Sequence, residues 1–218
     1  MADIILMSAK NRSMLNNTPP AWLYRRPRVL NLLHSLGIAS PHSQMNQVEK
    51  QCLRKYATGK SNALEIGTYM GVTASIIAMS LEDKGQLVCV DPFESKNNKQ
   101  NPGLVMAERE LKRQHVFHKT RFLFGYSNDK EIINKIPQRL DFILVDGDHS
   151  YEGLKNDWQI VLSKLDSNGI VCLHDTTIPE KEPYRNFGSV AYFNDVIKND
   201  TNFVLLETVY SMNILQRK

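Results

Sequence analysis

The sequence predicts an α/β fold built on a doubly wound, mostly parallel sheet. Five short runs, apolar on both faces and rich in branched residues, predict buried parallel strands at residues 63–67, 86–91, 120–125, 140–147 and 169–175. Helix-length segments separate them, at about 71–83, 103–117, 128–136 and 151–165. The chain therefore alternates strand and helix, which is the pattern of a Rossmann-like sheet.

The C-terminal part predicts two further strands and one reversal of direction. A helix is expected near residues 188–199, followed by apolar runs at 203–209 and 211–216. No crossover helix fits between these two runs, so they must pair as an antiparallel hairpin. We expect seven strands, with one antiparallel strand near the C-terminus.

The N-terminal residues 1–58 predict an arm and a helical cap, ahead of one compact unit at 59–218. The polar arm ends at Thr18-Pro19-Pro20, which cannot continue a helix. Apolar residues at helical spacing lie between Val29 and Leu36, and a second helix is expected from about Ser43 to Gly59. Pairing of two copies through these helices would give a homodimer.

The composition excludes several classes of protein. The chain has 218 residues, 42% of them hydrophobic, and a formal net charge of +4, which is too small to imply nucleic acid as a partner. Three cysteines without a CxxC motif favour a reducing compartment. The N-terminus does not resemble a secretory signal, and no apolar run approaches the roughly 18 residues of a membrane span. We expect a cytoplasmic protein without a membrane partner.

Polar residues follow the predicted strands where an open parallel sheet binds its ligand. The first strand runs into Glu65, Gly67, Thr68, Tyr69 and Gly71, and the second ends at Asp91. The glycines permit a tight turn into a helix, although packing alone could also require them. Asp91 is placed to accept both hydroxyls of a ribose, with a simple turn cap as the alternative.

The spacing of the glycines separates two classes of cofactor. A dinucleotide site has glycine where this chain has Tyr69, so the pattern E-x-G-x-x-x-G favours a ligand without a pyrophosphate. An oxidoreductase using NAD on the same sheet is the less favoured alternative.

Four segments together, EIGTYMG, CVDPF, ILVDGDHSYEGLKNDW and NGIVCLHDT, resemble the class I S-adenosylmethionine (SAM)-dependent methyltransferases. Within that class the resemblance is to small O-methyltransferases with the VDGDHSYEG segment, and it covers about residues 60–180. It implies SAM as cofactor and a small hydroxylated metabolite, sugar or natural product as acceptor. The same resemblance implies that Glu65, Gly67 and Gly71 line the methionine end, Asp91 binds the ribose, Tyr126 and Ser127 contact the adenine, and Asp146 touches the cofactor amino group or a metal.

His149 is the candidate general base, with Asp146 beside it. An imidazole with an ordinary pKa near 6.5 can take a proton from a hydroxyl at neutral pH. The related catechol-type enzymes have lysine at this spacing, so histidine is a departure from their pattern. A structural role for His149 is the alternative.

Asp146, His174 and Asp175 end neighbouring strands and form a candidate metal site for Mg²⁺ or Mn²⁺. Two carboxylates at this distance would repel unless a cation or proton lies between them. Residues that only cap loops are the alternative. Two alternative functions for the same fold also stay open: a metal-dependent hydroxylase and a non-catalytic binding module.

The loops at 92–102 and 176–187 should decide which acceptor binds.

Overall fold

The computed structural model describes residues 23, 26–93 and 101–218, so the predicted arm at residues 1–20 lies outside the described residues. The seven strands form one sheet in the order β3-β2-β1-β4-β5-β7-β6. Strand β7 pairs antiparallel with both β5 and β6, and the other pairings are parallel, which confirms the predicted fold class. The strands are β1 (Asn62–Ile66), β2 (Gln86–Asp91), β3 (Thr120–Phe124), β4 (Leu140–Val145), β5 (Leu165–Leu173), β6 (Phe203–Val209) and β7 (Met212–Arg217).

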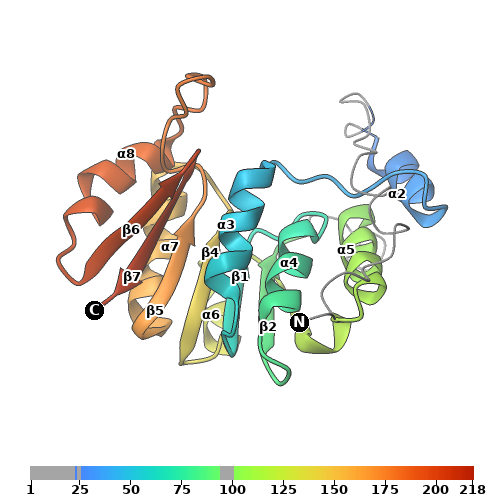
Figure 1. Ribbon diagram of the computed structural model, residues 1–218, viewed down its shortest axis with the longest axis horizontal. Coiled ribbons are helices and arrows are strands. Elements are labelled where there is room, and N and C mark those ends of the chain that lie inside the picture. Colours follow the sequence, from blue (N-terminus) through green and yellow to red (C-terminus); the bar gives the residue numbers. More distant parts are fainter. Residues whose placement is uncertain (1–22, 24–25, 94–100) are drawn as a thin grey trace, which may run out of the picture.

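Helices cover both faces of the sheet (Figure 1). One buried cluster joins one face of the central strands to α3, α4 and α5, and a second joins the opposite face to α6, α7 and α8. The central strands are buried on both sides, which explains why their sequences are apolar throughout. The described helices are α2 (Pro27–Ser35), α3 (Gln47–Ala57), α4 (Val72–Ser80), α5 (Pro102–Arg113), α6 (Lys130–Lys135), α7 (Tyr151–Lys164) and α8 (Gly188–Asp195), with short 3₁₀ turns at Phe117–Lys119 and Ile197–Asn199.

Element boundaries differ from the sequence predictions at several ends. Strand β5 begins at Leu165 rather than at residue 169, and its register with β4 shifts between Leu140 and Phe142. The helix predicted at 188–199 is divided into α8 and a 3₁₀ turn. Local propensity does not determine such ends, because they are set by pairing with neighbouring elements.

The N-terminal helices pack in two different places. Helix α3 contributes Cys52 and Leu53 to the main core, whereas α2 packs against α5 through a separate small cluster. The N-cap of α3 is Asn46, three residues after the predicted helix start at Ser43. The Asn46 side chain accepts hydrogen bonds from two backbone N–H groups of the first turn, and Glu49 Oε2 accepts one from Asn46 N. Leu32 is exposed on α2. A homodimer through these helices stays a prediction.

The helices and the cysteines bear on the expectations about membranes and disulfides. Among the described helices none has the length and apolar character needed to cross a bilayer. The three cysteines, all in the described part of the chain, are buried and free. Cys89 and Cys172 lie within the buried strands β2 and β5, and Cys52 lies on the buried face of α3, so all three behave as small core residues.

Candidate functional site

A cavity of about 590 Å³ lies at the carboxyl ends of strands β1 to β5. This is the edge at which open parallel sheets bind ligands. Nine residues singled out from the sequence line it: Gly67, Thr68, Tyr69, Asp91, Tyr126, Ser127, Asp146, His149 and Asp175. Three others, Glu65, Gly71 and His174, lie outside its wall.

The two glycines after β1 are required by packing of the protein itself. Gly67 has a φ of +89°, and a Cβ there would overlap the backbone carbonyl of Asp146. Gly71 has a φ of +76°, and its Cβ would lie 2.6 Å from the Cα of Ala107 on α5. Only glycine fits both the left-handed backbone and the close approach. Gly71 therefore brings α5 close to the turn, whereas Gly67 also borders the cavity.

Asp91 organises the turn that follows β1. Its Oδ2 accepts hydrogen bonds from the backbone N–H groups of Thr68 at 2.9 Å and Tyr69 at 2.8 Å. Its Oδ1 accepts from Phe93 N at 2.8 Å. Oδ2 already accepts two hydrogen bonds and Oδ1 accepts one, so Oδ1 keeps a further lone pair. Because the residue borders the cavity, Asp91 can hold this turn and still accept a ligand hydroxyl.

Tyr69 stands where a dinucleotide site would have glycine, and its backbone adopts the left-handed conformation with a φ of +51°. A non-glycine residue pays a steric cost in this region. The N–H bond to Asp91 holds it there, and its side chain is 44% exposed at the rim of the cavity. The turn thus has a glycine-like backbone but a large aromatic side chain in the opening.

Glu65 is a fully buried carboxyl group beside this turn. Neither of its oxygens has a hydrogen-bond partner, and the hydroxyl of the cavity residue Thr68 is likewise unpartnered. Burial raises the pKa of Glu65 to about 8, with the nearby hydroxyls of Thr73 and Thr68 offsetting part of the rise. Such a group favours a neutral state unless a donor or a cation comes near it.

Ser127 is fixed from behind by a residue that the sequence analysis did not single out. Its hydroxyl donates to Asp157 Oδ1 on α7 at 2.5 Å, and Asp157 is only 2% exposed. Burial raises the pKa of Asp157 to about 7. The wall next to Tyr126 is therefore held in place by a polar contact between β3's loop and α7.

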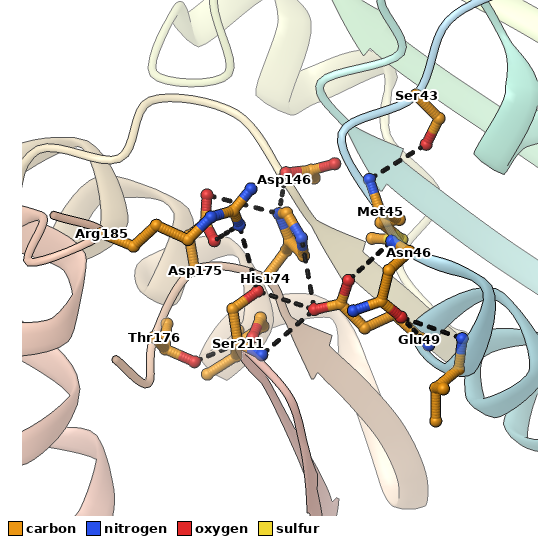
Figure 2. A network of polar contacts seen from close by, with 12 residues as sticks. Ser43, Met45, Asn46, Glu49, Asp146, His174, Asp175, Thr176, Arg185 and Ser211 are labelled. Carbon is orange, nitrogen blue, oxygen red and sulfur yellow. Dashed lines mark hydrogen bonds and ion pairs between the residues drawn. The ribbon is translucent and has the colours of Figure 1, made fainter. Parts of the chain in front are cut away.

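His149, Asp146, His174 and Asp175 form one cluster at the ends of β4 and β5, and Figure 2 shows three of them. His174 Nδ1 lies 2.7 Å from Asp146 Oδ1, and His149 Nδ1 lies 3.0 Å from Asp175 Oδ2. The second nitrogen of His149, Nε2, is 3.6 Å from Asp146 Oδ1. The sequence analysis thus identified four side chains that do meet.

Cations of the protein compensate the clustered carboxylates. Arg185 Nη1 binds Asp175 Oδ1 at 2.5 Å. Burial alone would raise the pKa of Asp175, but His149, His174 and Arg185 hold it well below its ordinary value. Burial would lower the pKa of His174, but the charge of Asp146 and contacts with Glu49 raise it to about 10. The cation expected between the carboxylates is therefore supplied in part by side chains.

The three residues whose ligand atoms converge differ from the predicted metal set. Atoms of Asp146, His149 and His174 all lie within 4.8 Å of one another. Asp175, predicted as a ligand, instead contacts Arg185 and His149. A metal here stays a prediction, with His149 replacing Asp175 in the set that geometry brings together.

Several cavity residues were missed by sequence reasoning. Residues 42–44 precede α3 and form one wall, and Phe187 packs against the ring of His149 at 5.3 Å between centroids. Glu49 and Arg185 contact the cluster from opposite sides (Figure 2). None of these residues belongs to a motif, although 176–187 was expected to shape the acceptor side.

Comparison with known proteins gives similar folds. An O-methyltransferase from Bacillus cereus, in complex with S-adenosylhomocysteine (SAH), is 17% identical, with a TM-score of 0.65 over 95% of this chain and 96% of that one. TomG, an O-methyltransferase from Streptomyces achromogenes involved in tomaymycin synthesis and in complex with SAM, is 16% identical, with a TM-score of 0.63 over 95% and 94%. An SAH-bound methyltransferase from Podospora anserina is 15% identical, with a TM-score of 0.61 over 96% and 94%.

Sequence comparison adds a relative and a family. An uncharacterised protein of Acanthamoeba polyphaga mimivirus is 25% identical over 115 residues, which are 51% of this chain and 50% of that protein. The chain thus spans about half the length of this curated relative. The sequence-family model "Methyltransferase domain" matches residues 64–176, just over half of the chain. The matched segment includes every strand end that borders the cavity. The chain belongs to the methyltransferase domain family.

Proposed function

We propose that this protein transfers a methyl group from SAM to an oxygen of a small hydroxylated acceptor, as in the O-methyltransferases with the VDGDHSYEG segment. One observation carries the proposal: a single cavity brings the ribose-binding candidate Asp91 and the candidate base His149 together in a methyltransferase domain. The O-methyltransferase neighbours support the same chemistry.

The residues present fit this cofactor. Asp91 Oδ1 offers a free lone pair for a ribose hydroxyl, and Tyr126 with Ser127 borders the place proposed for the adenine. The buried hydroxyl of Thr68 and the carboxyl of Glu65 both lack partners, and an ammonium group nearby would supply the missing donors. Bound SAM would supply a methyl group on a positively charged sulfur.

The residues of the cluster would then act on the acceptor. Asp175 faces His149 Nδ1 and leaves Nε2 as the nitrogen that takes the hydroxyl proton. Asp146, 3.6 Å from this nitrogen, would stabilise the imidazolium that results. Phe187, Tyr69 and residues 42–44 line the same cavity around His149.

Ligand binding tests the proposal before an acceptor is known. The melting temperature should rise with SAM and SAH but not with NAD or NADP, because a ligand at 100 times its Kd adds about 2.7 kcal/mol of stability. A rise with the nicotinamide cofactors alone would overturn the proposal in favour of an oxidoreductase.

The reaction itself needs a second measurement. Incubation with SAM and a panel of phenols, catechols and sugars should give products heavier by one methylene unit, detected by mass spectrometry. Products methylated on nitrogen or carbon, but never on oxygen, would refute O-methylation while leaving the cofactor assignment intact.

A further inference from the structure

Glu49 is a fully buried carboxylate that reaches the catalytic cluster from the N-terminal helix α3 (Figure 2). Its Oε1 accepts hydrogen bonds from Ser211 N at 3.1 Å and Ser211 Oγ at 2.7 Å. The same oxygen lies 3.6 Å from His174 Nε2. Glu49 therefore links α3, the β6–β7 turn and the end of β5 at one atom.

Helix capping does not account for this placement. The capping box uses the other oxygen, Oε2, which accepts from Asn46 N at 2.9 Å. A glutamate at this position of a helix can cap from the surface, whereas a buried carboxylate needs charged or donating partners to offset the loss of water. Its second oxygen is directed at Ser211 and His174, so the inward half of the side chain has a separate role.

Docking of α3 does not account for it either. The same helix contacts β6 at a second point, where Glu207 Oε2 binds Lys55 Nζ at 2.7 Å and Tyr56 Oη at 2.9 Å. This second contact is more exposed and distant from the cavity. It makes the same kind of link between helix and hairpin without involving a histidine.

His174 carries the effect of Glu49 towards the cavity. Its two ring nitrogens face two different carboxylates, Nε2 towards Glu49 and Nδ1 towards Asp146. A flip of the ring would break the hydrogen bond at Nδ1 and turn a carbon atom towards Glu49 in place of Nε2, so the two carboxylates favour one orientation of the ring. The 2.7 Å bond from Nδ1 then fixes the carboxylate of Asp146, which borders the cavity.

We propose that Glu49 is a positioning residue, which acts through the ring of His174 to hold the carboxylate of Asp146 in the orientation that receives the cofactor. The inference rests on the proposed function, and on the role as a contact of the cofactor amino group that the resemblance gives to Asp146. It gives α3 a part in the site beyond covering the sheet, since the loop before it, residues 42–44, also walls the cavity.

The test compares Glu49→Gln with Glu207→Gln, which removes a carboxylate from the other contact of the same helix with the hairpin. Glutamine at 49 can keep an oxygen for Ser211 but loses the charge facing His174, and its amide nitrogen then also replaces the oxygen that accepts from Asn46 N. We expect SAH affinity, measured by calorimetry, to fall about 10-fold for Glu49→Gln and to stay unchanged for Glu207→Gln. An unchanged affinity in both variants, or an equal loss in both, would overturn the proposal.

Two further measurements separate positioning from other causes. In a His174→Gln background, Glu49→Gln should cause no additional loss of affinity, because the relay is already broken; an additive loss contradicts the proposal. The ring ¹⁵N signals of His174, identified by their disappearance in His174→Gln, should move in Glu49→Gln and stay in place in Glu207→Gln. Unmoved signals in Glu49→Gln also contradict it.

Failure of the proposed function gives a different result. If Asp146→Asn binds SAH as well as the parent does, Asp146 has no role in binding the cofactor, and the His174 signals alone decide whether Glu49 positions the ring. Should Glu49→Gln not fold, Glu49→Asp replaces it, because the shorter side chain cannot span both Asn46 and His174. An affinity equal to that of the parent in Glu49→Asp would then refute the proposal.

Discussion

Glu65→Gln should make the ligand-free protein more stable at alkaline pH. The carboxyl group is fully buried without hydrogen-bond partners, and its pKa is raised to about 8 from 4.5. Because the folded state holds this proton more tightly than the unfolded state, the contribution of Glu65 to stability is fully present below pH 4.5 and is lost as pH rises towards 8. Each pH unit corresponds to 1.36 kcal/mol, so the full loss is about 5 kcal/mol.

Glutamine has a similar shape and carries no charge at any pH, so the variant should lack this loss. Parent and Glu65→Gln should melt within a few degrees of each other at pH 5. At pH 8.5 the variant should melt roughly 10 °C higher, since 1 kcal/mol moves the melting temperature by about 2 to 4 °C in a protein of this size. Differential scanning calorimetry between pH 5 and pH 8.5 measures both.

The control is Glu131→Gln, which removes an exposed carboxylate from α6. It should follow the parent at every pH. Parallel pH curves for the parent and Glu65→Gln would refute the reasoning, because they would mean that the carboxyl titrates alike in the folded and unfolded states. Urea titration at pH 8.5 provides the free energy directly and checks the calorimetric difference.

Three other changes should give measurable effects. Asp91→Asn should weaken SAH binding by roughly 1.5 to 3 kcal/mol and also lower the melting temperature, because the carboxylate accepts three backbone hydrogen bonds as well as facing the cavity; unchanged calorimetric affinity would remove Asp91 from the site. His149→Ala should lower turnover of an identified acceptor about 10²- to 10⁴-fold with little change in SAH affinity, and equal turnover from pH 6 to 9 would leave His149 a structural residue. Mn²⁺ should raise the melting temperature of chelator-treated protein more than Mg²⁺ does, because two of the three converging ligands are nitrogens. Asp146→Asn should abolish the rise. If neither ion shifts the melting temperature of the parent protein, the cluster is metal-free.

The sheet could be predicted because its strands obey a simple pattern. A strand buried on both faces must be apolar at nearly every position, so runs such as 140–145 stand out from their surroundings. The polar residue that follows such a run then falls at the ligand-binding edge, which is how Asp91 and Asp146 were found. Both conclusions need only the residues of one segment.

Residues that act across the fold could not be found in this way. Glu49 sits in a helix whose cap could be recognised, but nothing local shows that its second oxygen meets Ser211 and His174. Asp157 has the same character, since its partner Ser127 follows a different strand. Such contacts depend on how the helices pack against the sheet. Local sequence patterns predict helices and strands, but they do not show which residues of distant segments come into contact.

The carboxylates at the ends of β4 and β5 show how this affects chemical interpretation. Their repulsion predicts a positive charge between them, and a divalent ion is its simplest source. The fold places Arg185 on Asp175 and His174 on Asp146 instead, from a loop and a strand end that no spacing rule connects. A metal at Asp146 must therefore compete with a hydrogen bond already made, whereas Asp175 is already paired with a guanidinium. This asymmetry is the physical reason to test the ion through Asp146 and not through Asp175.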